Sequence, residues 1–143
     1  MSTEENKAII RRFLDELWNK GNLAIVDEVV ASNWTGHSNL PGMSSSREAA
    51  RAAVTSTRTA FPDMHVTFDD LIAEEDRVVL RSTTHGTHQG PLVGIPPTGK
   101  QVTMSGIAIY RLVDGKIVEQ WGVNDMLGLL QQLGVVPILG QSS

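Results

Sequence analysis

The chain has 143 residues, 12 Lys and Arg, 16 Asp and Glu, and a formal net charge of −4. Its composition, 41% hydrophobic and 20% charged, is that of a folded chain with a buried core and excludes a disordered tail. Because it contains no cysteine, a disulfide framework, thiolate zinc sites and thiol catalysis are excluded. We therefore expect one domain that spans residues 1–143.

The distribution of charge and apolar residues also limits the possible partners. Lys and Arg are scattered rather than gathered on a basic patch, which argues against a nucleic-acid partner. No apolar run approaches the roughly 18 residues that span a bilayer. The polar, acidic start is unlike a secretory signal. We predict a cytoplasmic protein that binds neither nucleic acid nor a membrane.

The first part of the chain has the patterns of helices. Ser2 and Glu5 have the spacing of a capping box, and apolar residues then recur at three- and four-residue steps. Ser45 and Glu48 repeat the capping-box spacing before an alanine-rich stretch. The expected helices run from Ser2 to Gly21, from Asn22 to Val30 and from Ser45 to Ala60.

After Pro62 the pattern changes to the two-residue period of strands. Met64, Val66, Phe68 and Ile72 alternate with polar residues, and Asp114-Gly115 favours a two-residue hairpin turn. Helices followed by antiparallel strands predict an α+β fold, in which helices cover the concave face of a curled antiparallel sheet. The expected strands are 64–72, 77–88, 102–112 and 117–124, with a short helix at 126–133.

Several motifs in the second half occur in an order that resembles the SnoaL-like polyketide cyclase family of the nuclear-transport-factor-2-like superfamily. The motifs are Gly86-Thr87-His88-Gln89-Gly90, the segment Gly94 to Lys100, Tyr110-Arg111, Asp114 to Glu119, and Gln132-Leu133-Gly134. The resemblance implies a cone-shaped half-barrel with a deep apolar pocket, often in a homodimer or higher homo-oligomer. It also implies cofactor-independent chemistry, since the founding members close a ring by an intramolecular aldol reaction. Relatives include isomerases and members without known activity.

The catalytic groups of the founding cyclases have no counterpart in this chain. Those cyclases use an aspartate on the last strand, assisted by a histidine and a glutamine on the neighbouring strand. Alignment through the Asp114 and Gln132 motifs puts these groups at Gly122, Ala108 and Gly106, respectively. We therefore predict that the chain is not an efficient aldol cyclase of the founding type.

Strand parity indicates which side chains share the pocket. Even positions of strand 102–112 are apolar and should face inward, and the same parity brings polar residues of the neighbouring strands into the interior. The alternative is close packing of helices on the sheet, with Trp34 in the core. The predicted substrate-binding residues are Trp34, Ser82, Thr84, Met104, Tyr110, Gln120, Trp121 and Asn124.

Three titratable residues are the candidate catalytic groups. His37 could position a substrate carbonyl, or lie on a surface loop at the rim. His88 could act as an acid or base near neutral pH, or hydrogen-bond backbone in its loop. Asp125 could be a general base if buried, or cap the last helix. The four histidines have no acidic partner at ligand spacing, so we predict no metal site.

Two functions follow from these observations. The first is a cofactor-independent enzyme acting on a hydrophobic, polyketide-like carbonyl compound by proton transfer, as a cyclase or isomerase. The alternative is a non-catalytic small-molecule binding or assembly domain of the same fold, which the missing cyclase groups favour. On the outer face of strand 102–112, Ile107 and Ile109 interrupt a polar row and predict a homodimer interface.

Overall fold

The computed structural model describes residues 1–38, 46–138 and 140. Its helical elements are α1 (Thr3–Leu14), the π-helical turn η1 (Asp15–Asn19), α2 (Ala24–Val29), α3 (Arg47–Ala60) and α4 (Met126–Leu133). Its strands are β1 (Val30–Ser38), β2 (His65–Glu74), β3 (Arg77–Thr87), β4 (Gln101–Val113) and β5 (Lys116–Asn124). Within these described ranges, no helix is long and apolar enough to cross a membrane.

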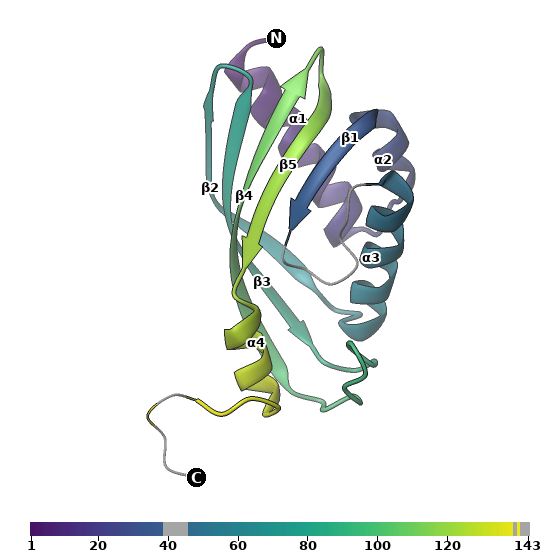
Figure 1. The fold of residues 1–143 in the computed structure, drawn as a ribbon, viewed down its shortest axis with the longest axis vertical. Coiled ribbons are helices and arrows are strands. Elements are labelled where there is room, and N and C mark those ends of the chain that lie inside the picture. The colour runs from purple at the N-terminus through teal and green to yellow at the C-terminus, as the bar shows by residue number, and fades with distance from the viewer. Residues whose placement is uncertain (39–45, 139, 141–143) are drawn as a thin grey trace.

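The strands form one curled, unclosed sheet in the order β1-β5-β4-β3-β2. The helices α1, α2 and α3 lie on one side of this sheet, and α4 lies beyond the end of β5 (Figure 1). This arrangement confirms the α+β fold class predicted from the helix and strand patterns. One face of the sheet therefore receives the helices, while no helix formed by the described residues covers the other face.

The prediction of four antiparallel strands was wrong in one respect. Residues 30–38 form a fifth strand, β1, which pairs in parallel with β5 through Val30↔Ile117 and Ser38↔Gly122. Only Val30 and Trp34 of this strand are buried, so its sequence lacks the two-residue alternation that marks a strand. Its partner also lies far along the chain, beyond the reach of local pattern reading.

Local signals at the element ends agree with the structure. Ser2 and Glu5 make both hydrogen bonds of a capping box, from Glu5 N–H to Ser2 Oγ and from Ser2 N–H to Glu5 Oε1, each at 3.1 Å. Ser46 is the N-cap of α3 and accepts from the Ala49 N–H at 3.0 Å, whereas Ser45 lies outside the described residues. At the β4–β5 hairpin, Asp114 and Gly115 have φ values of 49° and 78°, as a type I′ turn requires.

The second strand is divided by a β-bulge. Phe68 pairs with Ser82, but Asp70 pairs with Arg81, so one residue is inserted between them. The inserted residue reverses the side of the sheet to which the following side chains of β2 point. Leu71 therefore packs on the core, while Ile72 is 62% exposed on the outer face. The expectation that Ile72 shares a face with Met64 and Val66 was therefore wrong.

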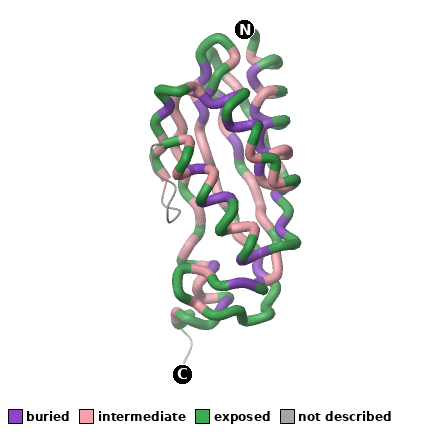
Figure 2. Tube along the Cα trace, turned by 90° about the vertical axis from the view of Figure 1, so that its right-hand side faces the viewer, coloured by how far each residue is buried: buried purple, intermediate pink, exposed green. Residues whose placement is uncertain are grey.

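The core lies between the helices and the concave face of the sheet. Buried segments recur along the helical layer and alternate with exposed ones (Figure 2). A larger cluster joins α1, α2 and α3 to the upper sheet, and includes Ile10, Phe13, Val54, Val78 and Ile117. A smaller cluster near α4 includes Phe61, Met64 and Leu133. The space between these two clusters holds the cavity described next.

Candidate active site

A cavity of about 580 Å³ opens between α3 and the concave face of the sheet. The strands β2 to β5 supply one wall and α3 the opposite wall, while α4 and the loop at 91–93 lie at one end. Its size is in the range of small-molecule sites in proteins. The lining residues include Trp18, Ser38, Ser56, Phe61, Met64, Ser82, Thr84, Met104, Gly106, Ala108, Tyr110, Gln120, Gly122, Asn124 and Met126.

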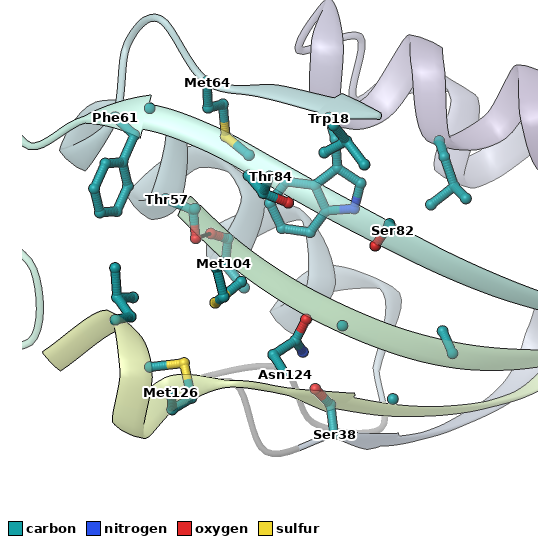
Figure 3. A pocket seen from close by; sticks show the side chains of 18 of the residues that line it. Trp18, Ser38, Thr57, Phe61, Met64, Ser82, Thr84, Met104, Asn124 and Met126 are labelled. Carbon is teal, nitrogen blue, oxygen red and sulfur yellow. Dashed lines mark hydrogen bonds between the residues drawn. The ribbon is translucent and has the colours of Figure 1, made fainter. Parts of the chain in front are cut away.

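The sheet wall is built from rungs of residues paired across neighbouring strands. Ser82 on β3 pairs with Gly106 on β4, which pairs with Asn124 on β5. Nearer to α1, Tyr110 on β4 pairs with Gln120 on β5. Because paired residues point to the same face, polar groups from three strands face the cavity together (Figure 3).

The helical wall contributes Trp18, which lies in the π-helical turn η1 (Figure 3). Its neighbour Asn19 is held to β2 by two hydrogen bonds, donating to the Val66 carbonyl at 3.2 Å and accepting from the Val66 N–H at 2.7 Å. The Arg58 guanidinium of α3 donates to the Trp18 carbonyl. These contacts fix the backbone on both sides and hold the indole toward the cavity.

Sequence patterns alone did not identify this side of the site. Trp18 has the position of a core residue on an amphipathic helix, and its periodicity gives no sign of the π-helical turn. Phe61 and Met64 lie between the end of α3 and the start of β2, where the direction of each side chain depends on the conformation of the connecting turn. Further lining residues missed by sequence analysis are Ser38, Ser56, Thr57, Met126 and Leu129.

Six of the predicted substrate-binding residues line the cavity. The inward parity of β3, β4 and β5 brings them together as the alternation predicted, without a bulge that interrupts the β3–β4 pairing. Their roles in binding stay a prediction. The six are Ser82, Thr84, Met104, Tyr110, Gln120 and Asn124.

The other two predicted binding residues, Trp34 and Trp121, do not line the cavity. Trp34 is 6% exposed and belongs to the larger core cluster. Trp121 lies on the outer face of the sheet, where Arg77 sits 5.3 Å from the centre of its ring. The odd position of Trp121 on β5 explains this facing, since its neighbours Gln120 and Gly122 point inward.

His37 is likewise on the outer face. It pairs with Trp121 across β1 and β5, stacks on that indole at 5.7 Å between ring centres, and places Nε2 3.2 Å from a Glu119 carboxylate oxygen. The neighbouring Ser38 lines the cavity instead. The surface-loop alternative does not describe this position, because the segment is a strand, which turns His37 away from the interior.

His88 faces inward but lies behind the cavity wall. The side chain is fully buried, and its ring is 5.5 Å from the ring of Phe61, which does line the cavity. Its Nδ1 accepts from the Thr98 N–H at 3.2 Å and lies 3.0 Å from the Thr98 hydroxyl. These contacts anchor the loop that follows β3, as in the structural alternative considered for this residue.

Asp125 caps helix α4. Its carboxylate accepts from the Gly128 N–H at 2.8 Å, and it is not among the residues that line the cavity. The capping alternative thus describes its position. The three predicted catalytic residues, His37, His88 and Asp125, are not brought together at the cavity.

The cavity wall has few ionisable side chains. No Asp, Glu, Lys or Arg occurs among the described residues that line it. His85 is at its edge, with its ring nitrogen Nδ1 3.2 Å from the hydroxyl of Thr103, a residue at an outward position. Tyr110 is 3% exposed, and burial raises the pKa of its hydroxyl well above the ordinary value. Tyr110 is therefore a protonated hydrogen-bond donor at neutral pH.

The positions where the resemblance places the cyclase groups all face this cavity. Gly106, Ala108 and Gly122 line it, so the sites of the missing side chains are part of the wall. A Cβ built on Gly122 meets only the Ser38 hydroxyl, at 3.8 Å, among the described atoms. A Cβ built on Gly106 would overlap the side-chain oxygen of Asn124. A side chain therefore fits at position 122, whereas at position 106 it would displace the Asn124 amide.

Known proteins of similar sequence are polyketide cyclases. The chain is 32% identical over 130 residues to aklanonic acid methyl ester cyclase DauD of Streptomyces sp. strain C5, covering 88% of this chain and 80% of that protein. It is 37% identical over 89 residues to the cyclase DnrD of Streptomyces peucetius, covering 61% of each chain.

Solved structures share the fold closely. AclR from Streptomyces galilaeus, a proposed hydroxylase, superimposes with a TM-score of 0.86 at 33% identity, over 98% of this chain and 91% of that one. TsrD from Streptomyces laurentii gives a TM-score of 0.83 at 29% identity, over 95% of this chain and 99% of that one. The family model for SnoaL-like polyketide cyclases matches residues 8–133. The chain therefore belongs to the SnoaL-like polyketide cyclase family.

Proposed function

We propose that the chain binds an uncharged, polyketide-like carbonyl compound in this cavity and promotes ring closure or isomerisation in it without a cofactor. The observation that carries the proposal is that no Asp, Glu, Lys or Arg occurs among the described residues that line the 580 Å³ cavity. A charged group buried there would lose its hydration and find no carboxylate, ammonium or guanidinium partner among those residues. An uncharged ester or ketone avoids that cost.

The shape of the lining favours a flat aromatic ligand. Trp18 and Phe61 present ring faces and edges, and Met64, Met104 and Met126 place flexible thioethers around the same space (Figure 3). Sulfur–aromatic and ring–ring contacts stabilise aromatic ligands beyond simple burial of area. The two cyclases named above act on aklanonic acid methyl ester, which is a compound of this class.

The chemistry available to the wall is hydrogen-bond donation. Proton loss next to a carbonyl leaves an enolate oxygen, and donors aimed at that oxygen lower the barrier. The Tyr110 hydroxyl and the Gln120 amide, paired across β4 and β5, are suited to this role. A carbon flanked by two carbonyls, common in polyketides, is acidic enough to lose its proton to hydroxide or a buffer base that enters from solvent. The alkoxide formed on ring closure takes a proton back from solvent, so the proposed reaction relies on the donors that stabilise the enolate.

A second candidate is ligand binding without turnover. It is favoured by Gly122, Ala108 and Gly106, which stand where the resemblance places the acid/base and its two helpers. Each such group typically contributes about 10²–10⁴-fold to a rate. Binding would survive their absence, because the apolar wall and the neutral polar groups are intact.

One experiment separates these candidates. The purified protein is titrated with aklanonic acid methyl ester, binding is followed by tryptophan fluorescence, and ring closure is followed by chromatography. We expect binding, with ring closure at least about 10²-fold slower than that of a founding cyclase. Tyr110→Phe should reduce the rate further while leaving binding within about threefold. Binding without any turnover would support the second candidate, and no binding would contradict both.

We also propose that the protein is a cytoplasmic homodimer formed through the outer face of the sheet. A row of apolar side chains crosses this face in register, from Ile72 through Val79 and Ile109 to Trp121. Beside the row, Ile107 is 53% and Val123 68% exposed. A contiguous apolar surface of this kind is typical of an interface.

The expected mass is therefore that of a dimer at micromolar concentration, measured by size exclusion with light scattering. Ile109→Lys places a charge in the centre of the row and should convert the dimer to a monomer, because an unpaired charge in an interface is costly. Val113→Lys, at an exposed residue in the β4–β5 hairpin, is the control and should remain dimeric. A monomeric unmodified protein would contradict the proposal.

A further inference from the structure

We propose that Ser82 and Asn124, on either side of Gly106, form a subsite for one uncharged oxygen of the ligand, a phenol hydroxyl. The inference rests on the proposed function for the ligand class and adds the residues that orient it. Sequence analysis placed both residues in the pocket but did not connect them. The connection comes from the register of three strands.

Ser82, Gly106 and Asn124 form one rung of paired residues across the sheet. Ser82 pairs with Gly106 and Gly106 pairs with Asn124, so the three residues lie side by side on β3, β4 and β5. All three line the cavity. Since neighbouring strands are about 4.8 Å apart, the outer two Cα atoms are about 10 Å apart with a glycine between them. Two short polar side chains therefore flank a gap in the wall.

The Asn124 amide lies over Gly106. A Cβ on Gly106 would overlap the Asn124 side-chain oxygen and lie 3.3 Å from its Cγ. The amide thus extends along the rung, over the bare Cα of Gly106 and toward the Ser82 side. Figure 3 shows Ser82 and Asn124 on the same wall, on the two strands that flank β4. Gly106 is required for this arrangement, because any side chain there would displace the amide.

The Ser82 hydroxyl and the Asn124 amide are both neutral hydrogen-bonding groups. A serine hydroxyl and a carboxamide each donate and accept hydrogen bonds and carry no charge. Because the Asn124 oxygen is the atom that lies over Gly106, the pair can hold a ligand hydroxyl, which donates to that oxygen and accepts from the Ser82 hydroxyl. An ionised carboxylate is disfavoured, because no Lys or Arg occurs among the lining residues in the described parts of the chain, and the exposed His85 side chain contacts the outward Thr103. The subsite therefore selects uncharged oxygen.

The test compares two flat three-ring probes that differ in oxygen content. Danthron, a dihydroxyanthraquinone, carries ring hydroxyls and ketones, whereas anthracene carries neither. Dissociation constants are measured by fluorescence titration for the unmodified protein and its variants. Ser82→Ala and Asn124→Ala should each weaken danthron binding roughly 3- to 10-fold and leave anthracene binding unchanged, since each removes a neutral hydrogen bond.

Two further variants test the geometry. Gly106→Ala should weaken danthron binding as much as Asn124→Ala does, and should have no additional effect when Asn124 is already alanine. Ser105→Ala is the matched control, because Ser105 is exposed at the neighbouring outward position of β4. It should bind both probes as the unmodified protein does. Thermal unfolding of each variant verifies that the fold is retained.

The outcomes separate this inference from the proposed function. Failure of the unmodified protein to bind either probe would contradict both. Binding of both probes with the same affinity in all variants would overturn the subsite alone. Equal weakening of danthron and anthracene would also overturn it, because that result reflects packing rather than hydrogen bonding. Additive effects of Gly106→Ala and Asn124→Ala would show that the amide does not lie over Gly106.

Discussion

Gly122→Asp should raise the rate of ring closure of aklanonic acid methyl ester by about 10²–10⁴-fold, the usual contribution of a positioned general base. The resemblance to the founding cyclases places their acid/base at this position, which faces the cavity. A Cβ there has the Ser38 hydroxyl at 3.8 Å as its only described neighbour, so a carboxylate can be accommodated. The rate constant is measured under single-turnover conditions, so that product release does not limit it.

Gly122→Asn is the matched control for this prediction. The amide has nearly the shape of the carboxylate but cannot accept the proton, so it should leave the rate near that of the unmodified protein. Burial in the apolar cavity should raise the pKa of the new aspartate. The gain in rate should therefore be present above that pKa and be lost as the pH falls through it. Equal rates for the Asp and Asn variants would show that position 122 does not face the reacting carbon.

Gly90→Ala should lower the free energy of unfolding by about 1–3 kcal/mol, the usual cost of forcing an extra methyl group into a packed site. Gly90 is buried, and its N–H donates to the Ala60 carbonyl at 3.1 Å. A Cβ there would overlap the Thr59 carbonyl oxygen and lie 3.2 Å from the Ala60 Cα. Because these neighbours are backbone atoms, they cannot rotate away as a side chain could.

Urea denaturation measures this loss, and Gly122→Ala is its control. The control adds the same methyl group to a position with open space, so its unfolding free energy should stay within about 0.5 kcal/mol. Displacement of Gly90 should also weaken ligand binding, since the next residues, Pro91, Leu92 and Val93, line the cavity. An unchanged unfolding free energy for Gly90→Ala would mean that the loop does not pack on the end of α3.

Local patterns predicted most of the fold because each is caused by a short-range interaction. The Ser2–Glu5 capping box, the Asp114-Gly115 turn and the alternation along β4 each fix a few neighbouring residues, and each is present in the structure. The pairing of β1 with β5 is not local, and no sequence pattern within residues 30–38 predicts it. The bulge in β2 is also not predictable from the sequence pattern, since one inserted residue reverses the side of the sheet to which the following side chains point without changing the composition.

The site was predictable to the same extent. Parity along regular strands correctly brought Ser82, Tyr110 and Asn124 to the cavity. It did not do so for His37, because a residue's facing can be counted only after its segment is known to be a strand. Trp18 was missed for a related reason, since its π-helical turn is anchored to other elements, by Asn19 hydrogen bonds to Val66 and by the Arg58 hydrogen bond to the Trp18 carbonyl.

The pairing of β1 with β5 has a consequence for the order of folding. It joins Val30 to Ile117 and Ser38 to Gly122, residues that are separated by most of the chain. Contacts of such long sequence separation form late, because closing a large loop costs entropy before any contact repays it. On the ribosome, β1 therefore has no partner until β5 has emerged. The hairpins β2–β3 and β4–β5 can form earlier, so the wall that contains Ser38 and Gly122 is completed last. A chain truncated before β5 lacks the part of the cavity wall that Gln120, Gly122 and Asn124 supply.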